Sequence, residues 1–126
     1  MFKYGMIICF LLCLTACESK TEPPSPEKTY SFTTPIRQLT DMKKTLKNKE
    51  TEKATRTFWK THPFFHDIDP PLRKKDPVLA DEMWMTVAAI EIEVKKKPID
   101  SVTLLTYTTH LIEVTKQAET KIGSKN

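Results

Sequence analysis

Two histidines and two aspartates lie within eight consecutive positions of the sequence. His62, His66, Asp67 and Asp69 form the pattern H-x-x-x-H-D-x-D. Imidazole and carboxylate groups are ligands for zinc, ferrous iron and copper, so the four residues are a candidate metal site. Pro63 within the cluster and Pro70 directly after it predict an irregular backbone, in which the histidines need not share a face. In that alternative, Asp67 or Asp69 caps a turn.

A second pair with metal-ligand spacing, His110 and Glu113, stands three residues apart in the last apolar segment. Carboxylate-bridged metal bundles use this spacing. At 100° per residue, however, His110 lies about 200° from Thr108, which is in the middle of the apolar arc of that segment. We therefore expect His110 to face solvent, where a pair with Glu113 contributes little stability.

The sequence gives no support for catalysis. It has no G-x-S-x-G pattern, and no serine of the expected core has an obvious base beside it. Glu91 and Glu93 fall on different sides of their helix. With only Gly5 and Gly123, the chain has no glycine-rich loop that could hold a phosphate. We expect no enzymatic activity, no cofactor and no nucleotide; a hydrolase is the third-ranked interpretation.

Four apolar residues of one helix give the most informative indication of function. Met85, Ala88 and Ile92 lie opposite the stripe that the same helix would turn to a core, and Trp84 lies beside them. Methionine adapts to partner surfaces, and tryptophan is common at the energetic centre of interfaces. We expect these residues to bind an envelope protein, unless the first helical hairpin or the N-terminal segment covers them.

The first seventeen residues, MFKYGMIICFLLCLTAC, have the layout of a secretory signal. A lysine precedes an almost wholly apolar run over residues 6–14. The run is shorter than the roughly 20 residues that a membrane-spanning helix needs. Its end, Leu14-Thr15-Ala16-Cys17, resembles the lipobox of bacterial lipoproteins: a branched apolar residue, two small residues and the cysteine that becomes the first residue after cleavage.

This resemblance implies that residues 1–16 are removed and that Cys17 carries a thioether-linked diacylglyceryl group. The new amino group would be acylated by a chain such as palmitate. Two or three chains make such an anchor effectively permanent, because each buried methylene contributes about 0.8 kcal/mol. The protein would then sit on the extracytoplasmic side of the cell membrane or outer membrane. The alternative is an ordinary signal peptide that contains cysteines.

Charge and cysteine content narrow the interpretation further. The chain has 20 basic and 16 acidic side chains and a formal net charge of +4. That balance suits anionic lipid headgroups but falls short of a nucleic-acid-binding protein. The other cysteines, Cys9 and Cys13, lie in the leader. Disulfides and thiolate catalysis are therefore not expected in the mature chain, which is long enough for one small domain.

The distribution of prolines and apolar residues predicts an all-α domain over residues 35–122. Residues 17–34 are rich in proline and predict a tether, with Tyr30 and Phe32 docking on the domain. A tail follows at 123–126. We expect a four-helix bundle, or a pair of helical hairpins, because short connections make successive helices antiparallel.

Start and stop signals divide this domain. Thr34-Pro35 begins a helix that ends near Asn48-Lys49, and a second begins near Glu50 with Ala54, Phe58 and Trp59 turned inward. Residues 62–71 form an irregular crossing, in which the apolar side chains Phe64, Phe65 and Ile68 close one end of the core. Asp76-Pro77 starts a helix that runs to about Lys96, and Asp100 caps the last one.

The span from Asn48 to Gln117 is similar in pattern to the soluble helical domain attached to some bacterial oxidase-dependent iron permeases. The similarity rests on Phe58-Trp59, on Asp76-Pro77 with Leu79, and on an apolar helix followed by proline-aspartate and a leucine-rich helix. The permeases' R-E-x-x-E signature is absent here, so no iron ligand is carried over. The resemblance implies a helical accessory module of the envelope. A metal-binding accessory lipoprotein, for example one linked to iron uptake, is the second interpretation.

Overall fold

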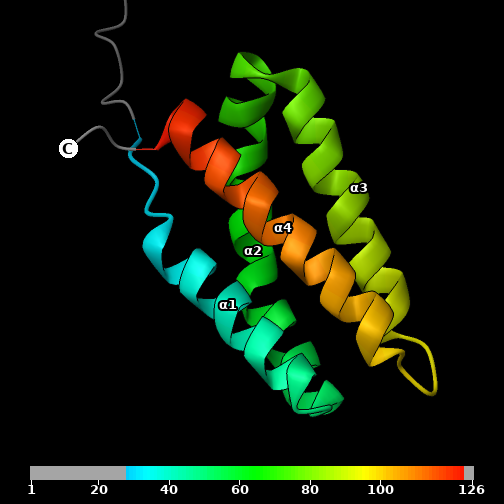
Figure 1. Ribbon diagram of the computed structural model, residues 1–126. Coiled ribbons are helices and arrows are strands. Elements are labelled where there is room, and N and C mark those ends of the chain that lie inside the picture. Colours follow the sequence, from blue (N-terminus) through cyan, green and yellow to red (C-terminus); the bar gives the residue numbers. More distant parts are fainter. Residues whose placement is uncertain (1–27, 124–126) are drawn as a thin grey trace, which may run out of the picture.

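The computed structural model describes residues 28–123, which form four α-helices (Figure 1). They are α1 (Thr33–Lys47), α2 (Thr51–Lys75), α3 (Pro77–Val94) and α4 (Ser101–Ile122). The expected all-α four-helix bundle is confirmed. The predicted leader 1–16, the predicted lipidation site Cys17, the predicted tether up to residue 27 and residues 124–126 lie outside the described part of the chain.

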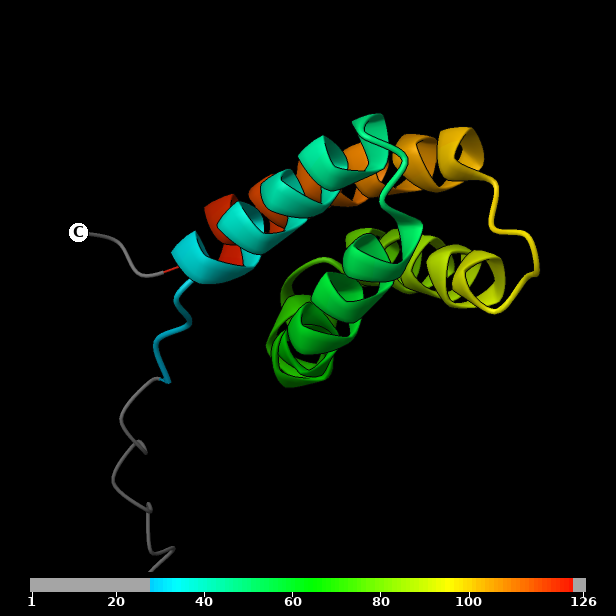
Figure 2. The ribbon, with the colours of Figure 1, turned by 90° about the horizontal axis from the view of Figure 1, so that it is seen from below.

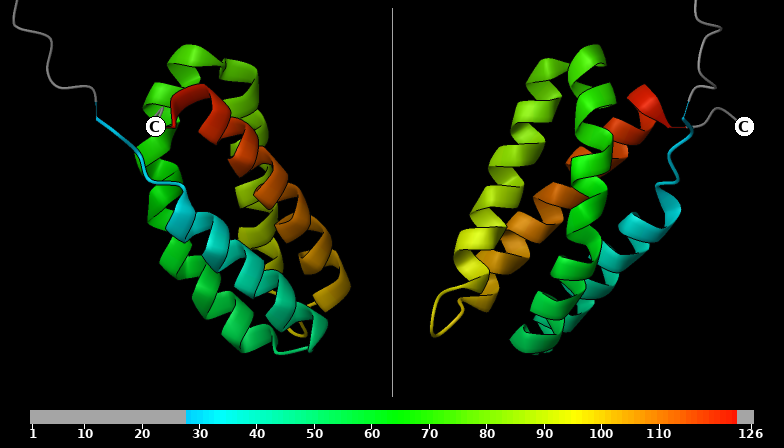
Figure 3. Two further views of the ribbon diagram at one scale, coloured as in Figure 1. Left: turned by 60° about the vertical axis from the view of Figure 1, so that its left-hand side comes forward. Right: turned by 180° about the vertical axis from the view of Figure 1, so that it is seen from behind.

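The helices form two layers (Figure 2). One layer contains α1 and α4 side by side, and the other contains α2 and α3; α1 also packs on α2, and α3 on α4. Because successive helices run in opposite directions, the α1–α2 and α3–α4 connections lie at the same end of the bundle (Figure 3). The α2–α3 connection lies at the other end, where Tyr30 and Gly123 form an isolated bridge that holds the two ends of the described chain together.

The two aspartate caps predicted from the sequence are formed. Oδ1 of Asp76 accepts a hydrogen bond from the backbone N–H of Leu79 at 3.0 Å, one turn into α3. Oδ1 of Asp100 accepts from the N–H groups of Val102 and Thr103 at 3.0 and 3.2 Å. These bonds satisfy N–H groups that lack an intrahelical partner, so both helices begin where local sequence dictates.

The start of α1 differs from the prediction by two residues. The helix begins at Thr33, and the residue before it, Phe32, makes no side-chain capping bond. Phe32 is buried, and its ring meets the edge of Phe64 with centroids 5.1 Å apart. Docking of Tyr30 and Phe32 is therefore confirmed, because Phe32 belongs to the core and Tyr30 packs against it.

At its other end, α1 stops at Lys47, next to the predicted end at Asn48-Lys49, and Lys49 takes the left-handed conformation (φ 60°).

The irregular crossing predicted over residues 62–71 is absent, since α2 continues through Pro63, Pro70 and Pro71 to Lys75. Each proline in a helix interior costs about 3 kcal/mol relative to alanine. Buried side chains at helical spacing on both sides of Pro63, Phe58 and Phe65 among them, offset that cost because they reach the core only if the helix continues. Packing has overridden local propensity here.

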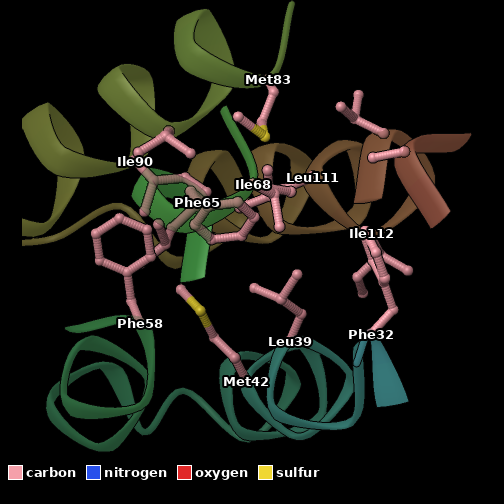
Figure 4. Packing of buried hydrophobic residues seen from close by; sticks show 14 of the residues in the cluster. Phe32, Leu39, Met42, Phe58, Phe65, Ile68, Met83, Ile90, Leu111 and Ile112 are labelled. Carbon is pink, nitrogen blue, oxygen red and sulfur yellow. The ribbon is translucent and has the colours of Figure 1, made fainter. Parts of the chain in front are cut away.

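The core lies between the two layers (Figure 4). Phe58 and Phe65 of α2 point toward Met42 of α1 and Ile90 of α3, and all four are fully buried. The predicted α3 stripe is confirmed as buried, and its members are Leu79, Met83, Val87, Ile90 and Val94. The inward position predicted for Trp59 was wrong, because 41% of this residue is exposed.

Candidate protein-binding surface

The histidines of the predicted metal site share one face of α2, because the helix is unbroken there. The ring centroids of His62 and His66 are 4.9 Å apart. Nε2 of His62 lies 2.6 Å from Oε1 of Glu91 on α3, in a partly buried contact. His62 thus connects two helices, a contact that the spacing of the sequence could not show.

The two aspartates of that site lie on different sides of α2. Asp67 is exposed and lies 100° around the helix from His66, the residue before it. Asp69 accepts a hydrogen bond from Nη2 of Arg73 at 3.1 Å. Among residues 28–123, no three His, Cys, Asp or Glu side chains are grouped so that they could hold a metal ion. The prediction that His62, His66, Asp67 and Asp69 converge is therefore corrected. The continuous helix turns Asp67 away from the histidines, whereas Asp69 lies on their side but is hydrogen-bonded to Arg73.

His110 is exposed on α4, as predicted from its position in the helix. Nδ1 of His110 lies 4.0 Å from a carboxylate oxygen of Glu113. The closer contact is to Glu82 on α3, with Nε2 and Oε1 3.0 Å apart. The pair is a surface contact between α3 and α4, and exposed pairs of this kind contribute at most about 1 kcal/mol.

Aromatic rings bridge the surfaces of α2 and α3. The ring centroid of Trp84 lies 4.8 Å from that of His66 and 6.4 Å from that of His62. Trp59 also belongs to this group, because its ring centroid lies 5.1 Å from that of His62. Trp84 is therefore only half-exposed and is held by its neighbours, which makes it a fixed anchor at the edge of the α3 surface.

The predicted partner-binding residues of α3 face outward. Met85 is 74% exposed and Ile92 62% exposed, and Ala88 between them is also exposed. Neither α1 nor the docked segment around Phe32 covers them, because within the described chain α1 packs on α2 and α4. The alternative that the first hairpin hides this face is thus excluded for residues 28–123.

Sequence reasoning missed one member of this surface, Val78, which is 75% exposed near the start of α3. The sequence contains a spacing that could have identified it. Val78, Met85 and Ile92 are seven residues apart, and the residue three positions after each of them also faces outward. We call the resulting line of side chains the outward row. It consists of Val78, Asp81, Met85, Ala88, Ile92 and the residue that caps the helix, Lys95.

A buried carboxylate holds the α3–α4 connection. Glu93 is almost completely buried, and its carboxylate accepts hydrogen bonds from Nζ of Lys96 at 2.7 Å and from the backbone N–H of Asp100 at 3.0 Å. These bonds, that from Lys96 above all, lower the pKa of the Glu93 carboxyl. Glu91, two residues earlier, points to α2, so the two acids do lie on different sides of the helix.

Figure 3 shows that the α1–α2 and α3–α4 connections lie at one end of the bundle, and the residues of this end are rich in lysine. Residues 41–56 and 93–100 contain nine basic and five acidic side chains, and the rest of residues 28–123 contains eight of each. The whole net charge of +4 within residues 28–123 therefore falls at the end opposite to Tyr30. Lys44 and Lys47 lie in the last turn of α1, where positive charge stabilises a helix, so solvation and capping account for part of the cluster.

No helix among residues 28–123 has the length and apolar character needed to span a membrane. Comparison of the chain with protein-family models, with curated proteins and with solved structures finds no match. The resemblances to bacterial lipoproteins and to the iron-permease domain remain predictions from the sequence.

Proposed function

We propose that this protein is a lipid-anchored binding module of the bacterial cell envelope, which docks a protein partner through the outward face of α3. The observation that carries the binding role is the exposure of Met85, Ala88 and Ile92 beside the fixed ring of Trp84. Monomeric proteins rarely leave a contiguous apolar patch of this kind uncovered, and such patches mark interaction sites. The anchor rests on the lipobox-like residues that end at Cys17.

The remaining surface favours a binding module over an enzyme. The described residues contain no group of metal-ligand side chains. The shallow depression beside the α1–α2 connection is lined by Lys49, Lys53 and Arg56 together with Glu50 and Glu52, so charges of both signs face it. In contrast, the α3 face combines an aromatic anchor, a methionine and aliphatic side chains, which is the composition of the centre of a protein interface.

The anchor is tested by mass spectrometry of the full-length chain expressed in a bacterial host. We expect an amino-terminal peptide that begins at Cys17 and carries the mass of a diacylglyceryl group, and a Cys17→Ser variant should retain its leader. An unmodified Cys17, or an intact leader on wild-type protein, would overturn the anchor.

The binding surface is tested with a photo-crosslinking amino acid introduced at Met85 of the full-length chain. Val102 on α4 provides the matched control, because it is 71% exposed and lies outside the α3 face. Crosslinked protein should form from position 85 and be weak or absent from position 102. Equal labelling from the two positions would contradict a binding role for α3.

A further inference from the structure

The outward row is the apolar feature that the four-helix packing leaves unexplained. The opposite side of α3 is filled by its buried stripe, so this helix is apolar on both sides. A helix that is apolar all round is normally covered on all sides. Three of the five large apolar residues that are exposed within residues 28–123 belong to this one row: Val78, Met85 and Ile92.

The spacing of the row defines the kind of element that would cover it. Val78, Met85 and Ile92 repeat every seven residues, and Asp81, Ala88 and Lys95 follow each of them by three. These are the a and d positions of a heptad repeat, whose side chains pack against a second helix. The surface therefore fits an α-helix lying along α3 better than it fits a loop or a sheet edge.

We propose that the helix covering the outward row is α3 of a second copy of this chain, in antiparallel orientation. The positions of the charged residues in the row favour the antiparallel orientation. Its two charged members, Asp81 and Lys95, stand at opposite ends. An antiparallel pair brings each aspartate toward the lysine end of the other copy, whereas a parallel pair would place like charges together. Oδ1 of Asp81 lies 2.6 Å from Nη1 of Arg73 in the same copy. The Asp81 side chain is nevertheless mostly exposed, so it remains within reach of a lysine of the second copy.

The sizes of the side chains fit the same arrangement. In an antiparallel pair, an a position of one helix lies beside a d position of the other, so Met85 of each copy lies against Ala88 of the other. The large side chain of Met85 fills the space above the small side chain of Ala88. Because the pair has two-fold symmetry, this contact occurs twice in the interface. Ile92 then lies near Asp81 of the other copy, and Trp84 flanks the interface on the α2 side.

Such a dimer is expected to be weak in solution. A single pair of helices of 18 residues buries less than the roughly 1,200–2,000 Å² of a typical stable interface. Attachment of both copies to one membrane would raise their effective concentration and favour pairing. The inference rests on the proposed function, because it names a second copy of this chain as the partner of the same α3 face.

Cysteine crosslinking of the full-length chain in its host tests the pairing. All three natural cysteines lie at or before position 17. Two differently tagged copies, one with Met85→Cys and one with Ala88→Cys, are coexpressed and treated with a short bismaleimide. We expect a doubly tagged dimer at a yield at least several-fold above that of two copies with Val102→Cys. A yield no higher than this control would overturn the proposal.

Charge reversal gives a second, independent readout on the same crosslinking pair. Asp81→Lys in both copies, or Lys95→Glu in both copies, should reduce the dimer several-fold, and Asp81→Lys in one copy with Lys95→Glu in the other should restore it. Unchanged circular dichroism of each variant shows that the fold is intact. Absence of rescue in folded variants would overturn the antiparallel arrangement.

The outcomes also separate this inference from the proposed function. If position 85 crosslinks to a different envelope protein while no dimer of this chain forms, self-pairing is wrong and the binding role stands. If the dimer forms but Cys17 carries no lipid, self-pairing stands and the membrane anchor is wrong.

Discussion

The carboxylate of Glu93 accepts a hydrogen bond from the backbone N–H of Asp100, seven residues later, at 3.0 Å. Asp100 in turn caps α4, so one buried acid fixes where the last helix starts. Because α4 contacts all three other helices, this bond positions α4 against the rest of the bundle. The first prediction concerns the ionisation of this acid.

Replacing Glu93 by Gln should lower the free energy of unfolding at pH 7 and flatten its dependence on pH. The pKa of Glu93 is lowered in the folded protein, so the ionised group adds stability above the ordinary carboxyl pKa of about 4.3, and this is lost as the pH falls through the lowered value. Urea unfolding at pH 7 and at acid pH measures the effect. The exposed residue Glu113 serves as control, and an equal response of Glu113→Gln and Glu93→Gln would contradict the role of Glu93.

Replacing Pro63 by Ala should stabilise the protein by up to about 3 kcal/mol. Pro63 is exposed in the interior of α2, and it has no N–H to donate to the carbonyl of Trp59. Alanine would restore this helical hydrogen bond without removing a buried side chain. Pro77→Ala is the matched control, because the N–H at the first position of α3 has no intrahelical partner. Thermal unfolding that shows no gain for Pro63→Ala over Pro77→Ala would be evidence against a continuous α2.

Replacing Phe65 by Ala should destabilise the protein by about 3–5 kcal/mol. Phe65 is fully buried among side chains of the core, so its removal leaves a cavity (Figure 4). Trp59→Ala, six residues earlier in the same helix, removes a larger but partly exposed ring and should cost clearly less. Chemical denaturation of the two variants checks the order, and a greater loss from Trp59→Ala would contradict the packing described for α2.

Titration with zinc or copper should give no saturable binding at micromolar metal. The described residues place His62 and His66 together, but Asp67 lies on another side of the helix, Asp69 is hydrogen-bonded to Arg73, and Glu91 is hydrogen-bonded to His62. Calorimetry of the wild-type chain and of a variant with both histidines replaced by Ala measures this directly. Stoichiometric binding by wild type that disappears in the double variant would restore the metal-binding interpretation.

The features that the sequence determined by itself are local ones. The caps at Asp76 and Asp100 depend on side-chain bonds to N–H groups two or three residues away, and the buried stripe of α3 follows from 3.6-residue periodicity. The all-α class and the number of helices followed from these signals. The failure at residues 62–71 has a physical reason: local rules penalise each proline, but they do not include the burial energy that a continuous α2 gains at Phe58 and Phe65.

Only the tertiary structure decided which apolar surfaces are covered and which charged groups meet. The sequence identified two apolar sides of α3 but not which neighbour covers either, because burial depends on helices far away in the chain. The same is true of Glu91 reaching His62, and of the lysines of two separate connections that gather at one end of the bundle. Periodicity fixes the direction of a side chain on its own helix, whereas packing between helices determines what lies in that direction.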